Sequence, residues 1–126
     1  MHVRNALAVF FAAVVSFSVS AAPSERTKSE IDHLFNYLKL SGCKFYRNGK
    51  WHTAEVASDH LQTKYDYLLK KEMITSTEAF LEHGSARSST SGKPYQVQCA
   101  GSAPVESASC FKAELSRFRA KGPGSR

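Results

Sequence analysis

Hydrophobic residues in the first part of the chain recur with the spacing of an amphipathic helix. Between Ser24 and Leu40 they fall at intervals of three and four residues. The apolar positions are Ile31, Leu34, Phe35 and Leu38. This pattern predicts a helix with one buried face, which ends at Ser41-Gly42.

Helical spacing returns in three later segments. The pattern predicts a helix over residues 54–72, with Thr53 as its N-cap and an apolar stripe on one face. The residues of that stripe are Ala57, Leu61, Tyr65, Leu68 and Leu69. Thr75 and Glu78 have the spacing of a capping box, which predicts a short helix. A last helix is predicted to begin near Ser107. Its expected buried residues are Phe111, Leu115 and Phe118.

Gly84 allows two interpretations of the short helix, which contains Ala79, Phe80 and Leu81. As a glycine it can end the helix. It can also be a point of close packing inside it, because Ala86 continues the apolar pattern for another turn.

Strand patterns interrupt the helices at two places. Asn48-Gly49 is typical of a type I′ turn and predicts a hairpin between residues 43–47 and 50–52. After Pro94, alternation predicts a strand over residues 95–99, with Tyr95 and Val97 facing the core and the glutamines facing outward. The predicted fold class is α+β, a small single domain of about four helices with a three-stranded antiparallel sheet. Its order is helix, hairpin, helix, helix, strand, helix.

Residues 1–21 have the composition of a secretory signal peptide. Arg4 precedes an apolar run that ends in small residues, and the run is shorter than the about 20 residues of a membrane span. The small residues allow cleavage after Ala21 or Ala22, and we favour Ala21 because Pro23 directly after a cut would strain it. The expected organisation is a signal peptide at 1–21, a single domain at 22–120 and a disordered tail at 121–126.

The formal net charge of the chain is +6, with basic and acidic residues interspersed. This excess favours anionic partners, although no polybasic run is present. Export argues against nucleic acid as a partner, and binding of a single strand would need several aromatic side chains on one basic face of the sheet.

Three cysteines, Cys43, Cys99 and Cys110, allow three pairings. An oxidising compartment favours one disulfide. Cys43 and Cys99 lie on predicted strands, where neighbouring chains come within disulfide range. Cys110 adjoins Phe111 in a helical pattern. We therefore predict a Cys43–Cys99 disulfide and a free, buried Cys110.

Two polar segments are the candidate binding surfaces. The hairpin tip and the small-residue loop before the third strand each combine basic and hydrogen-bonding residues. The candidate residues are Arg47, Asn48, Lys50, Trp51, Arg87, Ser88, Ser89 and Lys93. Charge next to an aromatic side chain can bind an anionic or sugar-like surface. For Trp51 we favour the alternative, in which the indole packs into the core and anchors the turn.

No segment has the spacing of a catalytic or metal-binding motif. Gly84 and Gly92 are too far apart for a phosphate-binding loop, and Pro94 stands where Ser or Thr would ligate Mg²⁺. The histidines form no His-x-x-x-His pair. We therefore predict no catalytic residue, no metal site and no cofactor.

Five stretches of the chain are shared with one known family. The most specific are Phe-Tyr-Arg-Asn-Gly at 45–49 and Ser-Gly-Lys-Pro-Tyr at 91–95, and the others lie within 31–34, 57–64 and 77–80. Together they resemble the YfeK-like family of small exported bacterial proteins, a domain of unknown function. The resemblance implies one domain and a Gram-negative periplasmic location. Gly84 departs from similar sequences, in which the helix continues into the Ser-rich loop.

We expect a non-enzymatic periplasmic binding or accessory module, whose polar loop contacts a periplasmic protein or a component of the cell envelope. The alternative is a small periplasmic hydrolase that uses loop hydroxyls with Lys93 and a histidine. An enzyme needs a concave pocket in which a base reaches a nucleophile, whereas a binding module does not. No membrane span is expected after cleavage.

The signal-peptide interpretation predicts that the mature protein begins at Ala22. N-terminal sequencing of the exported protein should read Ala-Pro-Ser-Glu. A sequence that still begins Met-His-Val would contradict the prediction.

Overall fold

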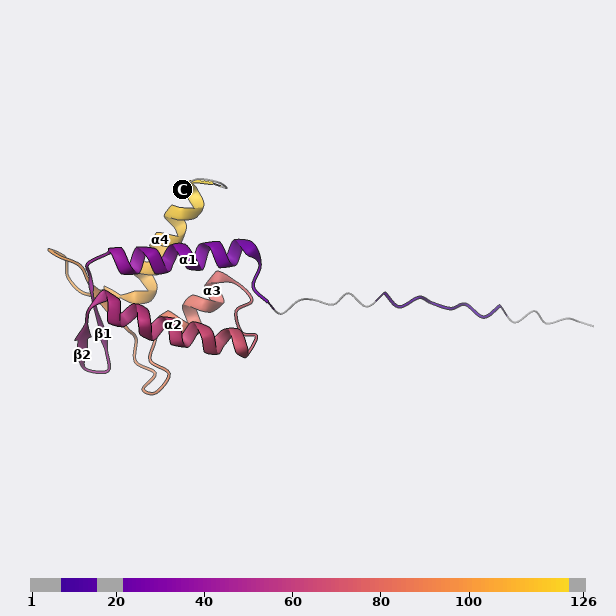
Figure 1. Cartoon of the computed structure of the whole chain (residues 1–126), viewed down its shortest axis with the longest axis horizontal. Coiled ribbons are helices and arrows are strands. Elements are labelled where there is room, and N and C mark those ends of the chain that lie inside the picture. The colour runs from indigo at the N-terminus through magenta and orange to yellow at the C-terminus, as the bar shows by residue number, and fades with distance from the viewer. Residues whose placement is uncertain (1–7, 16–21, 123–126) are drawn as a thin grey trace, which may run out of the picture.

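The computed structural model describes residues 8–15 and 22–122 (Figure 1). Its elements are α1 (Glu25–Leu40), β1 (Lys44–Arg47), β2 (Lys50–His52), α2 (Ala54–Lys70), α3 (Thr77–Phe80), the π-helical turn η1 (Leu81–Ser85), β3 (Gln96–Gln98), β4 (Val105–Glu106) and α4 (Ser107–Ala120). In the described part of the chain, no helix is both long and apolar enough to cross a membrane. Most of the predicted signal peptide, its cleavage site and the end of the predicted tail lie outside the described residues.

Side-chain caps begin α1 and α2, the second of them at the predicted Thr53. The Ser24 hydroxyl accepts a hydrogen bond from the Thr27 N–H at 3.1 Å, and the Thr53 hydroxyl accepts one from the Val56 N–H at 3.3 Å. Each cap satisfies a backbone donor that has no partner within its helix.

The start of α3 differs from its prediction by one residue. Its N-cap is Ser76, whose hydroxyl accepts from the Ala79 N–H at 3.0 Å, so the assignment of Thr75 as cap is wrong. Thr75 is exposed, while Thr77 is buried and bonds to another helix. Thr77 is thus both the first residue of α3 and a contact between α3 and α1.

The hydrophobic core lies between α1, α2, α4 and the α3–η1 segment. All four apolar residues predicted on α1 are buried, as are Phe111 and Leu115 of α4. Leu69 is 36% exposed, so its place in the buried stripe of α2 was predicted wrongly. Phe118 is only half-buried and stacks on His33, with ring centroids 4.1 Å apart.

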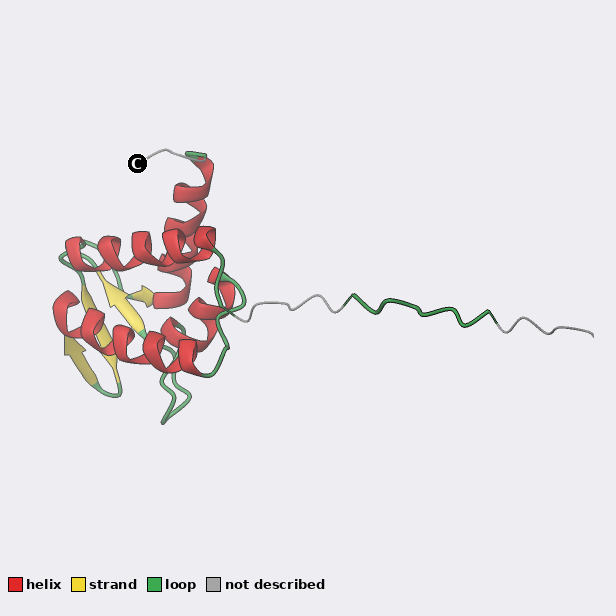
Figure 2. Ribbon diagram, turned by 45° about the vertical axis from the view of Figure 1, so that its right-hand side comes forward, coloured by secondary structure: helices red, strands yellow, loops and turns green. Residues whose placement is uncertain are grey.

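The antiparallel sheet has four strands in the order β2-β1-β3-β4 and lies at one end of the two long helices (Figure 2). The prediction of three strands missed β4, two residues in which Val105 pairs with Val97. Such a short strand has no alternation to detect. The predicted disulfide joins Cys43 to Cys99, and Cys110 is free but half-buried rather than buried.

Alternation divides the side chains of the sheet between two faces. Phe45 and Arg47 point toward the helices, whereas Tyr46 and Trp51 lie opposite each other on the outer face, with ring centroids 5.2 Å apart. Trp51 is 42% exposed, so the expectation that it packs into the core is wrong. It supports the hairpin through a cross-strand aromatic pair instead.

Gly84 is a point of close packing. It is buried within η1, and a Cβ atom there would lie 3.1 Å from the ring of Phe80 and 3.5 Å from Leu61. The helical path therefore continues past Gly84 to Ser85.

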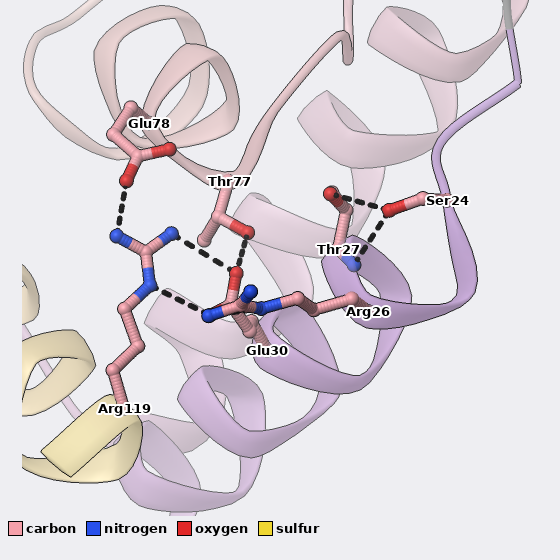
Figure 3. Close-up of polar contacts among 7 residues, drawn as sticks. All are labelled: Ser24, Arg26, Thr27, Glu30, Thr77, Glu78 and Arg119. Atoms are coloured by element: carbon pink, nitrogen blue, oxygen red, sulfur yellow. Dashed lines mark hydrogen bonds and ion pairs between the residues drawn. The ribbon is translucent and has the colours of Figure 1, made fainter. Parts of the chain in front are cut away.

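One buried carboxylate connects three helices (Figure 3). Glu30 of α1 is 3% exposed and receives two hydrogen bonds from the Arg119 guanidinium of α4, at 2.7 and 3.0 Å. The Thr77 hydroxyl of α3 donates to Glu30 at 2.7 Å, and Arg119 also pairs with Glu78. The hydrogen bonds from Arg119 are the main reason that the pKa of Glu30 lies below its usual value.

Replacing Arg119 with alanine should remove both guanidinium hydrogen bonds from this buried carboxylate and leave it the Thr77 hydroxyl and the longer ion pair with Arg26, at 3.8 Å. We expect Arg119→Ala to lower the free energy of unfolding by about 2–3 kcal/mol, since a buried charge that loses its main partner is costly. Arg117→Ala is the matched control, because it removes an exposed guanidinium from the same helix. It should cost about 1 kcal/mol or less. Urea denaturation measures both, and equal losses would contradict this role of Glu30.

Candidate functional site

A cleft of about 530 Å³, with mostly polar residue types along it, opens between α2, the β1–β2 turn and the loop of residues 86–95. The loop and the turn extend on the same side of α2 (Figure 2). The residues that line the cleft are Arg47, Asn48, His60, Thr63, Lys64, Tyr67, Leu68, His83, Ser88, Ser89, Thr90 and Tyr95. None of these lining residues is acidic.

Hydrogen bonds between the turn and the loop close one end of the cleft. Asn48 and Gly49 have positive φ angles of 49° and 86°, as the predicted turn requires. The Asn48 amide donates to the Ser88 hydroxyl at 3.1 Å and accepts from the Ser91 hydroxyl at 2.8 Å. One asparagine in the turn therefore holds both sides of the serine-rich loop.

The loop also has internal support. The Ser88 N–H donates to the Lys93 carbonyl at 2.9 Å, and the Ser88 hydroxyl accepts from the N–H groups of Thr90 and Ser91 at 3.3 Å each. The Tyr95 N–H donates to the Ala86 carbonyl at 3.0 Å. Ser88 is buried, and these bonds fix the conformation of the loop, which forms one wall of the cleft.

Three side chains form a hydrogen-bonded row across the floor of the cleft. Arg47 Nη1 lies 2.6 Å from His60 Nδ1, and His60 Nε2 lies 3.2 Å from the Tyr95 hydroxyl. A guanidinium only donates, so Nδ1 accepts and the neutral ring carries its proton on Nε2, which donates to Tyr95.

Lys64 reaches the same row from the next turn of α2. Its ammonium donates to the Tyr95 hydroxyl at 3.3 Å and to the Arg87 carbonyl at 3.0 Å. The ammonium also lies 5.0 Å from the centre of the Tyr95 ring. Because His60 and Lys64 both donate to its oxygen, Tyr95 keeps its own O–H as a further donor.

Burial of these groups shifts their protonation. Burial, followed by the charges of Arg47, Lys64 and His52, lowers the pKa of His60 to about 4. The pKa of Lys64 is lowered by burial and then by Arg47, and burial raises that of Tyr95. The two cations of the cleft thus face each other without a carboxylate between them.

The structure brings four of the eight candidate residues together. Arg47, Asn48, Ser88 and Ser89 line the cleft. The side chains of the other four, Lys50, Trp51, Arg87 and Lys93, are exposed and lie outside the lining. Tyr95 is buried, as its place in the strand pattern predicts.

His60, Lys64 and Tyr95 are cleft residues that the sequence did not single out. His60 and Lys64 are four residues apart and flank Leu61 on the inner side of α2. Polar residues at the border of an apolar stripe are the signal for such a site. This signal identifies a site only once the structure shows that Arg47 and Tyr95 lie opposite His60 and Lys64.

A family of unknown function (DUF5329) matches residues 25–119, which include every helix and strand nearly to the end of α4. Neither the curated proteins nor the solved structures contain a match to the chain.

The buried, neutral His60 should make stability depend on pH. The unfolded imidazole takes up its proton near pH 6.5 and the folded one near pH 4, so the unfolded state binds more protons between these values. The free energy of unfolding should therefore fall as the pH falls from 6.5 to 4.5. His60→Gln should flatten this slope in urea denaturation series.

His83→Gln is the matched control, since His83 is an exposed histidine at the edge of the cleft. It should retain the wild-type slope. An unchanged slope in His60→Gln would show that His60 does not cause the dependence.

Proposed function

The chain belongs to the DUF5329 family of unknown function, and we propose that it is an exported binding module whose cleft holds an anionic group. Its ligand presents a carboxylate, phosphate or sulfate to Arg47 and Lys64. The proposal concerns binding, and it assigns no chemical step to the cleft.

The observation that carries the proposal is a pair of cations, Arg47 and Lys64, for which residues 8–15 and 22–122 supply no carboxylate partner. Arg47 bonds to a neutral histidine, and Lys64 bonds to a carbonyl and a phenol. By contrast, Arg119 is paired with two carboxylates in the same domain. An anion between Arg47 and Lys64 would offset their repulsion and restore the pKa of Lys64 toward its usual value.

Neutral donors around the cations fit the oxygens of such an anion. Asn48 carries an amide, and Ser89, Thr90 and Tyr95 carry hydroxyls. Hydrogen bonds from several donors to a charged acceptor are stronger than neutral ones. The fixed loop and turn keep these donors in place, which reduces the entropy lost on binding.

Export is part of the proposal and has separate support. Val9, Phe10, Phe11, Val14 and Val15 are exposed, which suits a segment outside the folded domain. The Cys43–Cys99 disulfide is typical of an oxidising compartment. With the YfeK-like resemblance, these observations favour the periplasm, a mature domain at 22–120 and a partner in the periplasm or cell envelope.

The hydrolase alternative has less support. Both ring nitrogens of His60 are engaged, one by Arg47 and the other by the Tyr95 phenol, so neither is bonded to a Ser or Thr hydroxyl of the loop. Lys93 is exposed and lies outside the cleft lining. We propose instead that Lys93, Arg87, Lys50 and Trp51 contact a macromolecular partner around the cleft.

Inorganic sulfate tests the anion site, because its charge is constant over the useful pH range. Isothermal titration should detect sulfate binding to the wild type. Lys64→Met and Arg47→Met should each weaken it about tenfold or more, as expected for a lost charge-assisted hydrogen bond. Binding should also weaken as the pH rises through the lowered pKa of Lys64.

Lys112→Met is the control of equal charge, on an exposed position of α4. It should bind sulfate as the wild type does. Equal weakening in all three variants would indicate a general charge effect and contradict a site in the cleft.

A further inference from the structure

A second, smaller cavity of about 50 Å³ lies behind the cleft, between the inner face of the sheet and α2. Its walls are largely apolar and include Leu38, Phe45, Ala57, Leu61 and Phe111. A single water needs about 10–15 Å³ of such space, so the cavity has room for several atoms. Cavities with such walls tend to exclude water and bind apolar groups.

The cavity and the cleft have a common wall. Arg47, His60 and Tyr95 line both spaces. This is the hydrogen-bonded row in which His60 is the central member. A ligand that reaches from the cleft into the cavity must therefore displace the His60 side chain from this row.

Ser107 provides an independent indication of an occupant. It lines the cavity, is 1% exposed, and its Oγ has no hydrogen-bond partner among the described residues. Buried hydroxyls are nearly always hydrogen-bonded in folded proteins. The Ser107 hydroxyl is therefore available to a polar atom of whatever occupies the cavity, whether water or a ligand.

We propose that the protein binds a short-chain anion, with its charged group in the cleft between Arg47 and Lys64 and its aliphatic chain in the cavity behind His60. This inference rests on the proposed anion site and adds the class of ligand. The chemical class is a carboxylate, or a related anion, that carries a few methylene groups. A polar atom in the chain can pair with Ser107.

A series of linear carboxylates tests the inference: acetate, butanoate, hexanoate and octanoate. Each buried methylene contributes about 0.8 kcal/mol, which is about fourfold in affinity. Titration of the wild type should show affinity rising with chain length and reaching a plateau once the cavity is full. Affinity that is independent of chain length would overturn the inference.

Ala57→Leu should fill the cavity. This variant should bind sulfate as the wild type does but lose the dependence on chain length. Ala113→Leu is the matched control, since Ala113 is exposed on α4, and it should keep that dependence. Retention of chain-length dependence in Ala57→Leu would contradict the assigned cavity.

A measurement on the wild type covers the case in which Ala57→Leu does not fold. Nuclear Overhauser effects should connect the terminal methyl of bound hexanoate to the rings of Phe45 and Phe111. Contacts only to exposed side chains would overturn the inference. Sulfate binding without dependence on chain length refutes the cavity and leaves the anion site, whereas absence of sulfate and acetate binding refutes both.

Discussion

The pairing of the buried Glu30 carboxylate with Arg119 is the constraint on which the helical arrangement depends. A desolvated carboxylate is costly unless it is paired, so α1, α3 and α4 must keep the positions that supply Arg119 and Thr77. The other end of α4 is fixed by the Ser107 N–H, which donates to the Tyr95 carbonyl at 2.9 Å. Helix α4 therefore spans from the ion pair to the residue that forms the floor of the cleft.

Arg47 and Lys64, the cations of the cleft, differ from the Glu30–Arg119 pair because their hydrogen-bond partners are neutral. The chain places carboxylates around Arg119, yet it leaves Arg47 and Lys64 close to each other with neutral partners. That arrangement lowers stability, because the two positive charges repel and Lys64 is partly desolvated. Local costs of this kind are more common at functional sites than in parts of a domain that serve only folding. The unpaired cations are thus a stronger functional indication than the net charge of the chain.

Patterns among neighbouring residues predicted most of the helices and strands. They could not predict which distant segments contact each other. The periodicity of α1 and the Asn48-Gly49 turn are properties of neighbouring residues, and both predictions were confirmed. The exposure of Trp51 depends on which face of the sheet the helices cover, which no local pattern determines. Only some of the cleft residues were predicted, because the cleft also forms between distant segments of the chain. Its turn and loop residues are conspicuous in the sequence, but His60 and Lys64 become site residues only opposite Arg47 and Tyr95.

Gly84 is a core residue whose packing affects where the cleft forms. Its lack of a side chain allows the ring of Phe80 and the side chain of Leu61 to approach the η1 backbone, so η1 packs directly on α2. The loop leaves η1 two residues later, at Ala86, whose carbonyl accepts the Tyr95 N–H. A side chain at position 84 would meet the Phe80 ring at 3.1 Å, so either that ring or η1 must shift, and η1 leads directly into the loop whose Arg87 carbonyl accepts from Lys64. The closeness of loop and helix that forms the cleft thus depends on a buried glycine that does not itself line it.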